Sequence, residues 1–169
     1  MDKHFIFRSY WWLAAAVALI AIVVILASGS PGRESLIATT LGASLAFCYF
    51  VQRQKLDELR LFKDLFTDFN CRYDKMNDTL ENIRAGNGRS GTEVKKTLVD
   101  YFNLCAEEYL FFKEGYIHPE VWRSWCNGML YYLRDVGIRQ VWDEEMNSHS
   151  CQSYYDLTLP VIEQGAAMR

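Results

Sequence analysis

The stretch that decides the fold of this 169-residue chain is "LRLFKDLFTDFNCRYDKMNDTLENIR", residues 59–84. Apolar residues recur in it at alternating steps of three and four, which is the spacing of one helical face. Most of the intervening residues are polar or charged, so the stretch predicts a long amphipathic helix. We call the residues of its apolar face the apolar stripe: Leu59, Phe62, Phe66, Phe69, Tyr73, Met76, Leu80 and Ile83.

The stripe has two possible partners. A heptad-like repeat of this length forms a coiled-coil seam with another helix, and an amphipathic helix also packs on the rest of its own domain. Phe62, Phe66, Phe69 and Tyr73 are bulky for a two-stranded seam, where branched aliphatic residues are usual. The aromatic residues therefore favour packing on a globular domain, or in a bundle of more than two helices.

Two uncharged runs precede this helix. They are "WWLAAAVALIAIVVILA", residues 11–27, and "LIATTLGASLAFCYFV", residues 36–51. With its uncharged flanks each run reaches the length of about 20 residues that crosses a membrane, which predicts spans at about 10–28 and 35–52. The alternatives are a cleaved signal peptide for the first run and a buried core helix for the second. Two adjacent runs separated by a short turn favour a transmembrane hairpin.

Basic residues flank the two runs unevenly. Lys3 and Arg8 precede the first run, Arg53 and Lys55 follow the second, and the loop between them offers only Arg33, next to an acidic residue. Loops rich in Lys and Arg stay on the cytoplasmic side of a membrane. The basic residues therefore predict that both termini lie in the cytoplasm.

The rest of the chain predicts helices only, because no segment alternates with the period of a strand. Glycines at 85–92 end the long helix, and Ser90 with Glu93 predicts a capping box for the next one. Pro119 is expected to begin a further helix that ends at Gly137. Shorter helices are expected at 138–148 and 151–165. The predicted fold class is all-α, in three parts: a transmembrane hairpin (1–51), an amphipathic connecting helix (52–85) and a cytoplasmic helical domain (86–169).

The sequence contains no recognisable catalytic or metal-binding motif. None of its histidines has a second His or Cys at metal-ligand spacing, so neither a metal nor a cofactor is expected. Glu107 and Glu108, like the acidic residues at 143–145, are interpreted as solvated helix faces with nothing nearby to shift a pKa. A membrane-bound hydrolase that depends on Glu107, Glu108 or His118 is the least favoured alternative, and we expect no enzyme activity.

A glycine-rich loop that leads into a helix is one candidate anion site. Residues 86–96, "GNGRSGTEVKK", combine backbone N–H groups at a helix start with basic side chains, although a plain connector is the simpler interpretation. Other basic residues lie beside Trp and Tyr, and a nucleotide favours an aromatic face for its base and Arg or Lys for its phosphates. The candidate ligand-binding residues are Arg84, Arg89, Lys95, Lys96, Arg123, Arg134 and Arg139.

Net charge and small residues point to further partners. The net charge of -3 excludes a broadly basic protein, so no direct binding of duplex nucleic acid is expected.

Ala38, Gly42 and Ala46 recur every four residues in the second run, the small-xxx-small pattern that lets membrane helices approach closely. This pattern favours a homo-oligomer.

The layout of short N-terminus, apolar hairpin and helical domain resembles small two-span membrane effectors of prokaryotic antiviral systems. Closest in plan are the cyclic-oligoadenylate-gated membrane effector of type III CRISPR systems and the two-span effectors of retrons. The resemblance covers the whole chain, and "FNxRYDxxN" (69–77) and "DYFNLCAEEYLFF" (100–112) look like signatures of a bacterial protein family. The resemblance implies an oligomer in the bacterial inner membrane that stays silent until a signal arrives and then depolarises or breaches that membrane.

Two functions follow as hypotheses. In the first, the chain is a signal-gated membrane effector whose helical domain senses a cyclic nucleotide or a protein of the defence system, and the stripe helix transmits the change to the second span. In the second, the chain is a membrane-tethered module that docks a cytoplasmic protein partner.

Overall fold

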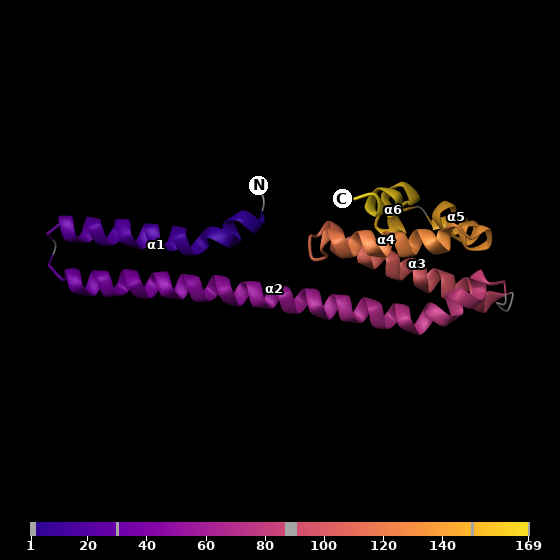
Figure 1. The fold of residues 1–169 in the computed structure, drawn as a ribbon, viewed down its shortest axis with the longest axis horizontal. Helices are drawn as coiled ribbons and strands as arrows, with labels where there is room; N and C mark the ends of the chain where they lie inside the picture. The colour runs from indigo at the N-terminus through magenta and orange to yellow at the C-terminus, as the bar shows by residue number, and fades with distance from the viewer. Residues whose placement is uncertain (1–2, 30, 87–90, 150, 169) are drawn as a thin grey trace. The chain divides into compact units, whose positions relative to one another are not determined.

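The computed structural model describes residues 3–29, 31–86, 91–149 and 151–168. Within these ranges the regular secondary structure is helical throughout, which confirms the predicted all-α class (Figure 1). The elements are α1 (Lys3–Ala27), α2 (Arg33–Arg84), α3 (Thr92–Lys113), α4 (Pro119–Leu133), α5 (Val136–His149), the 3-10 helix η1 (Cys151–Tyr154) and α6 (Leu159–Ala166). They form two compact units, which we call unit 1 (Met1–Arg60) and unit 2 (Leu61–Arg169).

Unit 1 consists of α1 and the first half of α2. Both α1 and α2 are long and apolar enough to cross a membrane. Most of their described apolar side chains are exposed, including those of Trp12 and Leu45. The contact between the two helices includes Tyr10, which packs with Cys48 and Val51 of α2.

Unit 2 is a helical bundle around one hydrophobic core. The last part of α2 packs there with α3, α4, α5, η1 and α6, and α6 lies most extensively against α4. The largest fully buried side chains come from all five α-helices of this unit and include Trp122, Tyr132, Phe69, Phe102 and Ile138. Most aromatic residues of this unit are therefore core residues, as the size of the domain predicts.

The apolar stripe packs mainly on its own domain. Phe69 and Leu80 are buried in the core of unit 2, and the partly buried stripe residues on the same core are Phe62, Tyr73, Met76 and Ile83. Phe66 is 39% exposed and stacks on the Trp125 ring, with centroids 6.0 Å apart, while Leu59 is exposed and belongs to unit 1. Of the two possible partners for the stripe, the structure supports the rest of the same domain.

The start of α3 and the end of α4 bear on two sequence-based predictions. Gly91 is the N-cap of α3, with a φ of 142° and no side-chain hydrogen bond. The predicted capping box depends on Ser90, which lies outside the described residues. Pro119 begins α4 as predicted, but that helix ends at Leu133 rather than at a glycine. The reason is Asp135, whose Oδ1 accepts hydrogen bonds from two backbone N–H groups of α5 at 3.0 Å each and so starts a new helix.

The segment expected as one helix at 151–165 is divided in two. Tyr155 and Asp156, between η1 and α6, have φ values of 55° and 66°, in the left-handed region that favours glycine. Their neighbours Tyr154 and Leu157 are 3% and 0% exposed. Burial of these two side chains on either side holds the backbone between them in a conformation that the sequence gives no sign of.

The contact between α4 and α6 depends on a glycine. A Cβ atom added at Gly165 would clash with the Sγ atom of Cys126 and would lie 2.6 Å from Nε1 of Trp122. Both partners are buried in the core. Gly165 therefore allows α6 to approach α4 at a distance that a larger residue would prevent.

Candidate functional site

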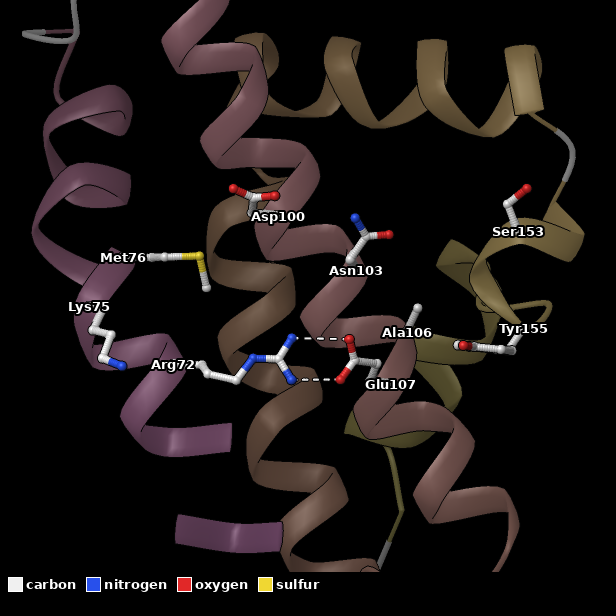
Figure 2. A pocket seen from close by; sticks show the side chains of 9 residues that line it. All are labelled: Arg72, Lys75, Met76, Asp100, Asn103, Ala106, Glu107, Ser153 and Tyr155. Carbon is white, nitrogen blue, oxygen red and sulfur yellow. Dashed lines mark hydrogen bonds and ion pairs between the residues drawn. The ribbon is translucent and has the colours of Figure 1, made fainter. Parts of the chain in front are cut away.

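A groove in unit 2 brings together side chains of α2, α3 and the η1 region. Its volume is about 480 Å³, within the range of small-molecule sites. Figure 2 shows that α2 and α3 form facing walls, with Ser153 and Tyr155 on the far side of α3. The lining residues are Arg72, Lys75, Met76, Asp100, Asn103, Ala106, Glu107, Ser153 and Tyr155.

The two walls of the groove are joined by an ion pair. Arg72 of α2 donates two hydrogen bonds to the carboxylate of Glu107 of α3, at 2.6 and 3.0 Å (Figure 2). The bond to Glu107 raises the pKa of the Arg72 guanidinium. Glu107 is therefore a structural partner of α2, and its interpretation as part of a solvated helix face is wrong.

The neighbouring Glu108 is 6% exposed. Burial raises its pKa to about 8, which the nearby positive charge of Arg72 only partly offsets. Its carboxyl group is therefore mainly protonated at neutral pH. The sequence-based expectation that nothing nearby would shift this pKa is wrong, because Glu108 faces the core of unit 2 rather than water.

Glu145 also departs from its interpretation as a solvated acidic residue. It is buried in unit 2, its carboxylate lies 3.1 Å from the Lys95 ammonium, and it accepts a hydrogen bond from the Tyr154 hydroxyl at 3.4 Å. These contacts connect α3, α5 and η1. Lys95, a predicted anion ligand, is thus used in a bond within the domain.

A polar network connects α2 with α4. The Tyr132 hydroxyl lies 3.0 Å from the Tyr73 hydroxyl, 3.0 Å from the Asn77 side-chain oxygen and 3.1 Å from Glu81 Oε1. Burial raises the pKa of the Tyr132 phenol, and its bonds to Tyr73 and Glu81 raise it further, so this hydroxyl keeps its proton at neutral pH. We call these four residues and the neighbouring Tyr131 and Arg84 the tyrosine network.

Arg84 forms the outer end of this network. Its guanidinium lies over the Tyr131 ring, 3.9 Å from the centroid, donates to the hydroxyl of the same tyrosine and lies 3.5 Å from Glu81 Oε2. A cavity of about 500 Å³ opens here, lined by Arg84, Ala85, Tyr131, Arg134 and Asp135. The structure therefore brings together two predicted ligand-binding residues, Arg84 and Arg134.

The remaining predicted ligand-binding residues are dispersed. Arg123 donates to the Met168 carbonyl at 3.2 Å, and Arg139 pairs with an acidic residue one turn later in α5. Arg139 also lines a shallow hollow with Arg134. Lys96 lines none of these cavities, and Arg89 lies outside the described residues.

The small residues of the second apolar run face outward in unit 1. Ala38, Gly42 and Ala46 are exposed, and a Cβ added at Gly42 would meet no atom within 4 Å. The contact with α1 uses a different residue, Cys48. The small-xxx-small face is therefore open on unit 1, and its role in self-association stays a prediction.

Sequence reasoning missed the residues that make most of the polar contacts. Arg72, Glu81 and Tyr132 were not candidates, because single charged or aromatic residues on a helix carry no sign of their partners. The two signature stretches held a clue, since Arg72 and Tyr73 of the first meet Glu107 and Tyr101 of the second.

The structure gives no sign of a metal centre in the ranges it describes, where no three His, Cys, Asp or Glu side chains lie close enough to hold an ion. Comparisons of the chain with protein families, with curated proteins and with solved structures find no match. The function is therefore argued from the residues of this chain.

Proposed function

We propose that the chain is a signal-gated membrane effector, in which the helices of unit 1 form a transmembrane hairpin and unit 2 is a cytoplasmic sensor. The observation that carries the proposal is the composition of α2. This one helix combines an uncharged, largely exposed segment, residues 36–51, with stripe residues that pack into the core of unit 2. A change in the packing of unit 2 thus has a helical connection to the apolar segment.

Polar groups within the apolar segment are compatible with lipid. Thr39, Thr40 and Ser44 each donate a hydroxyl hydrogen bond to a backbone carbonyl four residues earlier, at 2.8 to 2.9 Å. A donor that is satisfied inside its own helix avoids the penalty of a bare polar group in hydrocarbon. Lys and Arg are more frequent before the first run and after the second run than in the loop between them. This distribution supports an orientation with both termini in the cytoplasm.

The effector role extends this membrane assignment. The layout of the chain supports it through its resemblance to the two-span antiviral effectors, which implies a homo-oligomer that breaches the inner membrane on receiving a signal. The open small-residue face at Ala38, Gly42 and Ala46 supports self-association in the membrane.

A second candidate function is a membrane-tethered docking module for a cytoplasmic protein. Exposed aromatic and aliphatic residues on unit 2 favour it, because such residues anchor protein interfaces. Phe66 and Trp125 stack at the surface, and Tyr116 and Val136 are exposed. In this case unit 1 serves only as an anchor.

Membrane insertion is tested with a matched pair of substitutions in α2. An arginine in the middle of a span opposes insertion by about 2.5–3.5 kcal/mol, so Leu45→Arg should move the protein from the alkali-resistant membrane fraction toward the soluble or degraded fraction. Leu56→Arg, at an exposed site beyond the apolar run, should leave it in the membrane. Equal behaviour of both variants would contradict the hairpin.

The two candidate functions are separated in living cells. Under phage challenge, cells with the wild-type protein should lose membrane potential, measured with a voltage-sensitive dye, and cells with Leu45→Arg should not. If the inserted protein leaves the potential unchanged under each phage that it restricts, and co-purifies with one host or phage protein, the docking module is correct.

A further inference from the structure

We propose that the cavity at the end of α2 binds the phosphoryl group of a small molecule between Arg84 and Arg134, and that this binding loosens the tyrosine network. The proposal rests on the proposed function, since it names the class of signal that unit 2 would sense. All residues involved belong to unit 2.

The first step is the charge of the cavity. The Arg134 guanidinium makes no hydrogen bond or ion pair with any residue that the structure describes. Among the described residues that line the cavity, Asp135 is the only one with a carboxylate, and it already accepts hydrogen bonds from the N–H groups of Gly137 and Ile138 at the start of α5. Arg84 is paired with Glu81 at 3.5 Å, whereas the Arg134 guanidinium is unpaired among the described residues, so Arg134 gives this cavity a positive group that favours an anion.

The second step is the chemistry of the two arginines. A guanidinium presents its N–H donors as a planar fork that matches two oxygens of a phosphate. The cavity volume of about 500 Å³ accommodates a ligand larger than phosphate alone. The Tyr131 ring, now covered by Arg84, offers an aromatic face to a planar ring once Arg84 turns to the phosphate. These features together favour a phosphate ester that carries a flat ring, such as a nucleotide.

The third step connects the ligand to α2. Glu81 lies within 3.5 Å of Arg84, the Tyr131 hydroxyl and the Tyr132 hydroxyl, so it links the cavity to the buried part of the network. A phosphate that draws Arg84 away removes one positive partner of the Glu81 carboxylate. The bonds that hold α2 to α4 through Tyr132 and Tyr73 then lose part of their support.

Binding is tested with the full chain in lipid nanodiscs. The soluble probes are inorganic phosphate, AMP and cyclic AMP, and discs of phosphatidylcholine are compared with discs that contain phosphatidylglycerol, because a lipid headgroup offers the same phosphoryl chemistry. Arg134→Gln is the test variant, since its guanidinium supports no contact among the described residues. Lys96→Gln is the matched control, because it removes one positive charge of unit 2 outside the cavity.

At least one soluble probe should bind saturably to the wild type, measured by calorimetry. Arg134→Gln should lower the affinity for that probe by about tenfold or more, which is the effect of losing a charged hydrogen bond. Lys96→Gln should bind as the wild type does. No saturable binding of any soluble probe, or equal binding by Arg134→Gln, would overturn the proposal. If only discs that contain phosphatidylglycerol slow amide exchange at the cavity, and Arg134→Gln abolishes this effect, the site belongs to a lipid headgroup and the small-molecule proposal is overturned.

The coupling is read by hydrogen exchange. The bound probe should speed amide exchange in the part of α2 from residue 73 to 84, and should do so less in Tyr132→Phe, where the network is already interrupted. Binding without any change there would refute the coupling. If the probe binds and loosens α2 but the membrane potential never responds, the proposed effector function is wrong and the binding site stands. If the membrane potential is lost but no probe binds, the effector function stands and the binding site is wrong.

Discussion

Arg72 and Glu107 join α2 to α3 through two hydrogen bonds of 2.6 and 3.0 Å. They belong to the two stretches that look like family signatures, residues 69–77 and 100–112. The pair lies on the groove of unit 2 and is partly screened from water, with roughly a third of each side chain exposed. Its N–O distance of 2.6 Å is the shortest of the ion pairs in the part of the chain that the structure describes.

This geometry predicts a measurable coupling between the two residues. In a double-mutant cycle of Arg72→Met and Glu107→Gln, we expect a coupling energy of about 1 kcal/mol in the free energy of unfolding, smaller at high salt. The exposed pair Arg60 and Asp57, at 3.3 Å, is the control and should show almost none. Equal coupling in both cycles would mean that the bidentate geometry adds nothing.

Glu108 predicts a pH dependence of stability. Its folded pKa of about 8 lies above the ordinary value of 4.5, so the folded state retains a proton that the unfolded state releases. The contribution of this group is complete below the unfolded pKa and is lost as the pH rises to the folded pKa. Relative to Glu108→Gln, the wild type should lose about 1.4 kcal/mol of unfolding free energy per pH unit within this window.

The measurement is urea unfolding of both proteins at several pH values between the two pKa values. Glu114→Gln, an exposed change just after the same helix, is the control and should follow the wild type. Parallel pH profiles for wild type and Glu108→Gln would show that Glu108 is solvated after all.

Gly165 predicts opposite effects for one substitution at two glycines. Gly165→Ala should destabilise unit 2 by about 1–3 kcal/mol, because the added methyl group meets the buried Cys126 and Trp122 side chains. Gly128→Ala, in the middle of α4 with no atom within 4 Å of the new Cβ, should stabilise it by about 0.5–1 kcal/mol. Thermal unfolding followed by circular dichroism compares them. A neutral Gly165→Ala would contradict the close approach of α6.

The stripe predicts unequal effects at neighbouring aromatic residues. Phe69 is 2% exposed, so Phe69→Ala should lower the unfolding free energy by about 3–5 kcal/mol. Phe66→Ala should lower it by only about 1 kcal/mol, because that ring is partly exposed on Trp125. Both variants should remain in the membrane fraction, which is the control for insertion. Equal losses of unfolding free energy in the two variants would favour the alternative that the stripe forms a coiled-coil seam rather than packing on its own domain.

The sequence predicted the elements of the fold better than their ends. The period of the stripe and the uncharged runs reflect burial over many residues, so the long helix up to Arg84 follows from them. The end of α4 at Leu133 does not, because it depends on one side chain, Asp135, that bonds to the next helix. Gly137, two residues after Asp135, was the stronger local signal for a helix end, and the end predicted from it was wrong.

The candidate site was predictable only in part. Arg84 and Arg134 were both candidates, Arg134 because it follows Tyr131 and Tyr132 in the sequence, and the structure places both on one cavity. Glu81, the partner of Arg84, was not a candidate, because the sequence does not distinguish it from other carboxylates on the polar side of a helix. The burial of Glu108 was hidden for the same reason: a charged residue suggests solvent until its neighbours in space are known.

Tyr155 and Asp156 show that side chains can dictate backbone geometry. Tyr154 and Leu157 work as two fixed points, both immersed in the core, and the two residues between them must bridge a set distance. Asp156 tolerates its left-handed torsion angle better than Tyr155 does, because Asp is one of the few residue types besides glycine that are enriched in this region. The burial of Tyr154 and Leu157 therefore sets a local backbone conformation that Tyr155 by itself would seldom adopt.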